Sequence, residues 1–187
     1  MGTSTGTTTL GGANNNGTVF SLSVGLGPFV EAVTYSGKVG SIIEFLGQGF
    51  TSSSTVSFNG TTASRTVVSG TYLTATVPNG ATTGPVYVTT SGVTLKSNKT
   101  FRVIPQIKSF SPTSGPVRTV VTINGESFQA SPTGATTVTF TGGVKGTITS
   151  VSYTKITVKV PSEAKTGKIT VTTPGGTATR VGTFTVT

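Results

Sequence analysis

The sequence contains no cysteine, histidine, aspartate or tryptophan, and these absences exclude most kinds of active site. Without cysteine there is no disulfide and no thiolate metal site. Without histidine and aspartate, a Ser-His-Asp or Cys-His arrangement cannot be built, and zinc and calcium sites lose preferred ligands. The acidic residues are four widely spaced glutamates: Glu31, Glu44, Glu126 and Glu163. The sequence therefore predicts a chain that is not an enzyme and holds no cofactor or metal.

Charged side chains are also scarce, at 9% of residues against about 25% in a typical soluble chain. Their balance is one-sided, because 13 lysines and arginines against 4 acids give a net charge of +9. Such an excess favours polyanions through counterion release. The basic residues are spread singly, however, and no aromatic residues interleave with them. The pattern therefore favours solubility and the protection of edge strands over polyanion binding, and it disfavours nucleic acid as a partner.

Long apolar runs are missing as well. No stretch of about 20 apolar residues could span a membrane, so we expect no membrane insertion. The first residues lack the basic start and apolar run of a signal peptide. Two interpretations remain, a cytoplasmic protein or a piece of a longer secreted protein, and the character of both ends favours the second. We therefore expect an extracellular or cell-surface location, with other domains of a larger parent protein as partners.

What the sequence does contain is a series of short alternating strands separated by turn residues, which predicts an all-β fold. The same series occurs twice. Phe101 and Phe184 are 83 positions apart, whereas Phe50 and Phe128 are 78 positions apart. The difference places an insertion of five residues in a loop of the second copy, around residues 129–135. The chain is therefore predicted to hold two copies of one small β domain, residues 28–104 and 105–187.

Bulky residues recur at equivalent alternating positions of the two copies and are predicted to form the cores. They are Ile43, Phe45, Val56, Phe58, Val77, Val86, Val88 and Phe101, and then Val121, Ile123, Val138, Phe140, Val160, Ile169, Val171 and Phe184. Phe50 and Phe128 follow glycine turns and are predicted to plug one end of each domain. Only residues 102–106 join the copies, without a Gly/Ser linker, so we expect two domains end to end in a stiff rod.

The 27 residues before the first copy have a different character. Residues 1–17 are of low complexity, and one alternating strand follows them, with Thr18, Val19, Phe20, Leu22 and Val24 as its main residues. A single strand is not stable alone. It is expected to pair with the first domain, which is the favoured interpretation, or to add to the sheet edge of a neighbouring subunit as a strand donor.

One pattern covers most of residues 105–187. It runs Pro105-x-Ile107-x-Ser109-Phe110-Ser111-Pro112-x-Ser114-Gly115, then Val120-Val121-Thr122-Ile123-x-Gly125-x-x-Phe128, then Ile156-Thr157-Val158-x-Val160-Pro161. This pattern resembles the IPT/TIG domain, an immunoglobulin-like (E-set) β-sandwich found in plexin-type receptors, some transcription factors and many bacterial surface proteins. Residues 28–104 resemble it less fully, because Thr34-Tyr35 stands where the Ser-Pro turn is expected. Residues 12–20 are similar to the end of the GloVer repeats of large bacterial extracellular proteins.

The resemblance implies no single function, and three hypotheses remain open. The first is a structural and interaction module, a spacer or adhesion unit, of a secreted or cell-surface bacterial protein. The second is a glycan-binding accessory module, for which Tyr72 and Tyr153 are the candidate contact residues because both lie in or beside a turn. The third is a self-assembling extracellular fibre, joined through the strand at residues 18–24.

Overall fold

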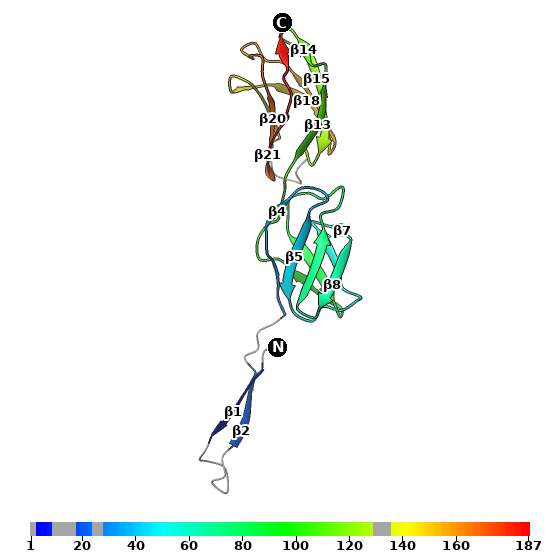
Figure 1. Cartoon of the computed structure of the whole chain (residues 1–187), viewed down its shortest axis with the longest axis vertical. Helices are drawn as coiled ribbons and strands as arrows, with labels where there is room; N and C mark the ends of the chain where they lie inside the picture. Colours follow the sequence, from blue (N-terminus) through cyan, green and yellow to red (C-terminus); the bar gives the residue numbers. More distant parts are fainter. Residues whose placement is uncertain (1–2, 9–17, 24–27, 129–135) are drawn as a thin grey trace.

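The computed structural model of the chain shows two β-sandwich domains placed end to end (Figure 1). It describes residues 3–8, 18–23, 28–128 and 136–187. Within these residues all regular secondary structure is β-strand. The predicted all-β fold with two immunoglobulin-like sandwiches is confirmed. We call residues 28–104 domain 1 and residues 105–187 domain 2.

Domain 1 is built from two four-stranded antiparallel sheets. The first has the order β3 (Val30–Ala32), β5 (Ile42–Gly47), β9 (Tyr72–Thr76) and β8 (Arg65–Ser69). The second has the order β11 (Val93–Lys96), β10 (Val86–Thr90), β6 (Thr55–Phe58) and β7 (Thr61–Ala63). A short parallel pair, β4 (Ser36–Gly37) with β12 (Arg102–Val103), completes the domain.

Domain 2 repeats this topology strand for strand. Its first sheet has the order β13 (Gln106–Ser111), β15 (Val120–Glu126), β19 (Lys155–Lys159) and β18 (Thr147–Val151). Its second has the order β17 (Val144–Lys145), β16 (Thr137–Phe140), β20 (Ile169–Thr173) and β21 (Gly176–Thr179). The parallel pair is β14 (Ser114–Gly115) with β22 (Thr185–Val186). The predicted insertion at residues 129–135 lies outside the described residues.

Two separate hydrophobic cores form, one in each domain. Every residue predicted to point inward is buried, because alternate side chains of a strand share one face and both sheets turn that face inward. Edge-on ring pairs lie at the centre of both cores, with Phe58 and Phe101 4.9 Å apart and Phe140 and Phe184 5.7 Å apart between ring centroids.

The predicted end plugs are confirmed, and a glycine makes room for each of them. A Cβ atom at Gly47 would stand 2.4 Å from the ring of Phe50, and one at Gly125 would stand 2.3 Å from the ring of Phe128. The residue before each phenylalanine has positive φ, 74° at Gly49 and 60° at Ser127. Each Gly-x-x-Phe corner therefore turns the chain back so that the ring covers the end of its own core.

The segment at residues 30–37 holds two short strands that belong to different sheets. It forms β3 in the first sheet, crosses at residues 33–35, and continues as β4 beside the last strand of the domain. The carbonyl oxygen of Tyr35 accepts a hydrogen bond from the Arg102 N–H, at 2.8 Å. The segment thus exchanges partners midway, which an alternating sequence pattern does not reveal.

The strand predicted to stand alone before domain 1 has a partner. It forms β2 (Thr18–Ser23) and pairs antiparallel with β1 (Thr3–Thr8), from Thr3 opposite Ser23 to Thr8 opposite Thr18. The prediction of an orphan strand is therefore wrong, and so is the expectation that it pairs with domain 1, since its sheet holds β1 and β2 alone. Of the proposed strand-donor residues, Thr18, Val19, Phe20 and Leu22 belong to β2, and Val24 lies outside the described residues.

Candidate functional site

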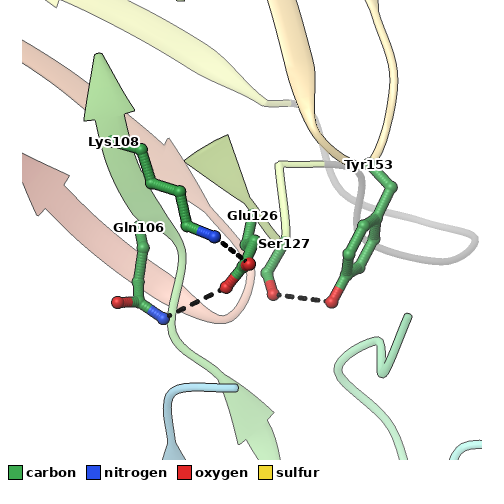
Figure 2. Close-up of polar contacts among 5 residues, drawn as sticks. All are labelled: Gln106, Lys108, Glu126, Ser127 and Tyr153. Carbon is green, nitrogen blue, oxygen red and sulfur yellow. Dashed lines mark hydrogen bonds and ion pairs between the residues drawn. The ribbon is translucent and has the colours of Figure 1, made fainter. Parts of the chain in front are cut away.

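A polar cluster lies on the Gly-x-x-Phe corner of domain 2, at the end of the domain that faces domain 1 (Figure 2). The Glu126 carboxylate, at the end of β15, forms an ion pair with Lys108 and accepts a hydrogen bond from the Gln106 amide at 3.5 Å. Both partners come from β13, which lies beside β15. Because Lys108 is exposed, this pair contributes about 0–1 kcal/mol to stability. The corner therefore combines an exposed ammonium group with a partly buried carboxylate and amide.

Tyr153 lies beside this cluster, in the turn between β18 and β19 (Figure 2). Its carbonyl oxygen accepts a hydrogen bond from the Phe128 N–H at 3.1 Å, and its hydroxyl is 3.2 Å from the Ser127 hydroxyl oxygen. The side chain is half-buried, whereas Ser127 is buried. Tyr153 is thus fixed to the corner at both its backbone and its hydroxyl, and it is not a fully exposed ring.

Tyr72 lies at the first residue of β9, at the end of domain 1 away from domain 2, and it is also half-buried. Burial, together with a hydrogen bond to the Glu44 carboxylate, raises the pKa of its hydroxyl above the ordinary value. The equivalent position in domain 2 is Lys155, and the equivalent of Tyr153 in domain 1 is Gly70. The structure therefore does not bring the two predicted contact residues together, and each stands at a position that its sister domain does not share.

A third tyrosine organises a polar cluster that the sequence did not single out. The Tyr35 hydroxyl donates to Glu31 at 2.6 Å and is 3.0 Å from the Asn98 side-chain oxygen. The Asn98 amide donates to the other oxygen of Glu31 at 3.1 Å, and the Lys99 ammonium lies 4.9 Å from the centre of the Tyr35 ring. Burial, then the hydrogen bond to Glu31, raises the pKa of Tyr35 to about 12. Asn98 is far from Glu31 and Tyr35 in the sequence, so no local sequence pattern could predict this cluster.

Domain 2 has a shallow cavity of about 200 Å³ at the corresponding place. Its lining includes Ser109, which is equivalent to Glu31, and Thr113, which is equivalent to Tyr35. The small Thr113 side chain leaves open the space that the tyrosine ring occupies in domain 1. Domain 1 is therefore closed by a hydrogen-bonded ring at a point where domain 2 is open.

The two domains meet without an intervening linker. The Val103 N–H donates to the Thr83 hydroxyl at 2.9 Å, the Ile104 N–H donates to the Gly37 carbonyl at 2.9 Å, and β13 then begins at Gln106. A Cβ atom at Gly175, in the turn between β20 and β21, would stand 1.9 Å from the Val103 carbonyl oxygen. The backbone of domain 2 therefore lies directly on the last strand of domain 1.

Beside this contact lies a groove of about 240 Å³ with a mostly polar lining. It is formed by Lys38 of domain 1, by the connecting residues 104–107, and by residues 177–179 of β21. The groove therefore draws residues from both domains and depends on their arrangement.

The described residues offer little to a metal ion, because no three histidine, cysteine, aspartate or glutamate side chains gather among them. Over the same ranges the fold has no helix of the length and apolar character that crossing a lipid bilayer requires. What these surfaces can do chemically is bind through hydroxyl, amide and charged groups.

Two stretches of the sequence, residues 28–103 and 105–186, match the sequence model of the IPT/TIG domain. The chain belongs to the IPT/TIG domain family. These matches cover most of the chain and confirm the tandem arrangement that the sequence pattern predicted. No curated protein matches the sequence.

Solved structures that are similar to this chain include two bacterial binding proteins and the extracellular region of a plexin. The surface glycan-binding protein PbSGBP-B from Prevotella bryantii is 21% identical, with a TM-score of 0.54 over 83% of this chain and 41% of that chain. An auxiliary nutrient binding protein from Bacteroides thetaiotaomicron is 22% identical, with a TM-score of 0.41 over 48% of this chain and 21% of that one. The extracellular region of plexin A4 is 17% identical, with a TM-score of 0.42 over 86% and 18%. This chain thus spans about two fifths of the Prevotella protein, and the likeness is one of fold.

Proposed function

We propose that this chain is a non-catalytic spacer and interaction module of a larger secreted or cell-surface bacterial protein. The observation that carries the proposal is the direct contact between the domains. Only Ile104 and Pro105 separate β12 from β13, and Pro105 is buried. The contact of Gly175 with Val103 adds a second point of attachment away from the connecting residues. Two points of attachment restrict both bending and twisting, which suits a unit that holds other domains at a fixed distance.

Small-angle X-ray scattering on the purified full chain tests this proposal. A spacer is expected to give the pair-distance distribution of one elongated monomer, unchanged with protein concentration and with ionic strength. A curve that requires several arrangements of the two domains, or one that changes with salt, would contradict the proposal. An additional compact population would contradict it equally.

Glycan binding is the second candidate, favoured by Tyr153 on a corner rich in hydrogen-bonding groups (Figure 2). A tyrosine ring beside carboxylate and amide groups can stack on a sugar while its neighbours bind the hydroxyls. A glycan array probed with the full chain, followed by titration of any hit against Tyr153→Ala and Tyr72→Ala, tests both predicted residues. Loss of a main aromatic contact weakens binding by about 2 kcal/mol or more. An array without hits, or a hit that neither variant weakens, would count against these tyrosines.

A fibre joined through β2 is the remaining alternative. Because β2 already pairs with β1 on one edge, a neighbouring subunit would have to pair with its other edge. Light scattering on the full chain and on a chain that starts at Pro28 tests it. Oligomers that disappear when residues 1–27 are removed would support a fibre. Monomers in both cases would exclude it.

A further inference from the structure

Five basic residues that are scattered in the sequence lie together at the end of domain 2 remote from domain 1. They are Arg118, Lys145, Lys159, Lys165 and Lys168. Lys159 ends β19, where it pairs with Val120 of β15 on one side and Thr147 of β18 on the other. Arg118 lies just before β15, and its N–H donates to the carbonyl oxygen of Val160 at 2.9 Å. Because β15 and β19 are neighbours in the first sheet, Arg118 and Lys159 occupy adjacent places at its end.

The other three cations belong to an adjoining loop and to the short strand β17. The Lys165 N–H donates to the Thr141 carbonyl at 3.0 Å, and the Thr141 hydroxyl donates to the Lys168 carbonyl at 3.2 Å. Lys145 lies on β17 opposite Thr139, close to the same loop. Hydrogen bonds of the backbone therefore hold all five positions at one end of the sandwich, which we call the basic end.

The side chains of the basic end are available to a partner. All five are exposed, and none of them has an ion-pair partner among the residues that the structure describes. The one acidic side chain in these loops is Glu163, which is exposed. The local balance is strongly positive, and the repulsion between unpaired cations favours the binding of an anion.

Domain 1 provides an internal comparison, because its equivalent end faces domain 2. The positions that correspond to the five cations are, in the same order, Gly40, Thr62, Thr76, Thr82 and Pro85. All are uncharged. The fold therefore does not require cations at these five positions, since the same positions are uncharged in domain 1. A general need for solubility would not concentrate them in this way.

From this placement we propose that the basic end of domain 2 binds an acidic polysaccharide. Four of its five cations are lysines, whose ammonium groups act as separate point charges and suit a polymer with spaced carboxylates. No tyrosine belongs to these loops to stack on a base, which disfavours single-stranded nucleic acid. The choice of a polysaccharide as the partner rests on the extracellular location proposed above. The presence of the charge cluster is independent of that location.

Titration of the full chain with polygalacturonate, beside uncharged dextran and duplex DNA, tests the inference. We expect saturable binding to polygalacturonate alone, weakening steeply as salt is added. Substituting the five cations of the basic end by glutamine is expected to weaken binding by about tenfold or more, given how strongly such charge steers polyanions. Tighter binding to DNA than to polygalacturonate, or no binding at low salt, would overturn the assignment.

A matched control removes the same charge elsewhere, at Lys38, Lys96, Lys99, Lys155 and Arg180. This variant also loses four lysines and one arginine, and it is expected to retain binding within about threefold of the parent chain, because separated exposed charges are screened at this range. Equal losses in the two variants would show that net charge alone drives binding and would overturn a local site. Small-angle scattering from both variants reports whether the rod persists. The spacer proposal and the proposal of a polysaccharide site can therefore fail separately.

Discussion

The two domains share their interiors and differ at their surfaces. Every core position predicted from the repeat is buried in both domains, and each domain closes one end with the same Gly-x-x-Phe corner. Outside the cores the copies diverge. The outer face of the first sheet carries Leu46 and Tyr72 in domain 1, where domain 2 has Asn124 and Lys155. The repeat therefore specifies the scaffold. Surface positions, which packing does not constrain, differ between the copies and give each domain its own surface chemistry.

The ends of the domains show the same division. In domain 1 the end with the Asn59-Gly60 turn lies against domain 2 and has uncharged residues at the five positions of the basic end, whereas in domain 2 the equivalent end is basic and remote from domain 1. The opposite end of domain 2 packs its β20–β21 turn, at Gly175, on Val103. The same turn of domain 1 contains Gly92, around which a Cβ atom would meet nothing within 4 Å. One turn of the fold is thus a contact in one copy and a free loop in the other.

The largest effect is expected from a core substitution that unfolds one domain and leaves the other folded. Phe184→Ala removes the ring that packs on Phe140 and is expected to cost domain 2 about 3–5 kcal/mol, against a total stability of about 5–15 kcal/mol for a domain. Because the cores are separate, domain 1 is expected to stay folded. Amide NMR spectra during urea unfolding measure this, with Phe101→Ala as the mirror-image variant. If either substitution unfolded both domains together, the two cores would not be independent.

A smaller effect is expected at the junction. Gly175→Asn places a side chain where the Val103 carbonyl lies, and such overpacking costs about 1–3 kcal/mol. The cheapest relief is separation of the domains, so we expect a larger spread of inter-domain distances with little change in the unfolding of either core. The matched control is Gly92→Asn. Gly92 lies at an open position with φ of 79°, a backbone conformation that asparagine tolerates. Equal behaviour of the two variants would show that the Gly175 contact does not hold the domains.

The smallest effect is expected at Tyr35. Tyr35→Phe removes the hydroxyl that donates to Glu31, and loss of one such half-exposed hydrogen bond costs about 1 kcal/mol or less. The pKa of Tyr35 is raised to about 12, and the unfolded chain titrates near 10, so the unfolded state loses its proton first. The contribution of this hydroxyl is therefore present below about pH 10 and is lost as the pH rises through about 12.

Comparing thermal unfolding of the parent chain and the Phe variant at pH 8 and pH 11 isolates this contribution, because other groups titrate alike in both. The difference in stability between the two proteins is expected to shrink at the higher pH. A difference that grows with pH would contradict the assigned direction of the shift.

The sequence was sufficient for the cores because packing leaves a periodic trace. Val56 and Phe58 alternate with polar neighbours, Ile43 and Phe45 lie on either side of Glu44, and domain 1 buries all four on the predicted face. The Asn59-Gly60 turn depends on local sequence in the same way, because Asn-Gly is a preferred hairpin pair and both residues adopt the positive φ that a tight hairpin requires. Such features depend on neighbours within a few positions, which is where sequence patterns are informative.

The features that escaped the sequence depend on residues far apart in the chain. The Tyr35 cluster needs Asn98, which the fold brings back beside β3, and the basic end gathers five positions that look evenly spread in the sequence. The strand β1 was missed for a different reason, because Thr3–Thr8 has no apolar residue to reveal an alternating pattern. The roles of Tyr72 and Tyr153 in binding remain predictions.

The rigidity of the junction is the claim on which this account most depends, and a distance measurement between the domains tests it most directly. The chain has no cysteine, so Thr66→Cys and Thr149→Cys place spin labels at exposed positions of β8 and β18 without further changes. Double electron–electron resonance is expected to give one narrow distance distribution, which broadens when Gly175→Asn is added. A broad or multimodal distribution in the parent chain would mean that the two domains move independently and would contradict the spacer.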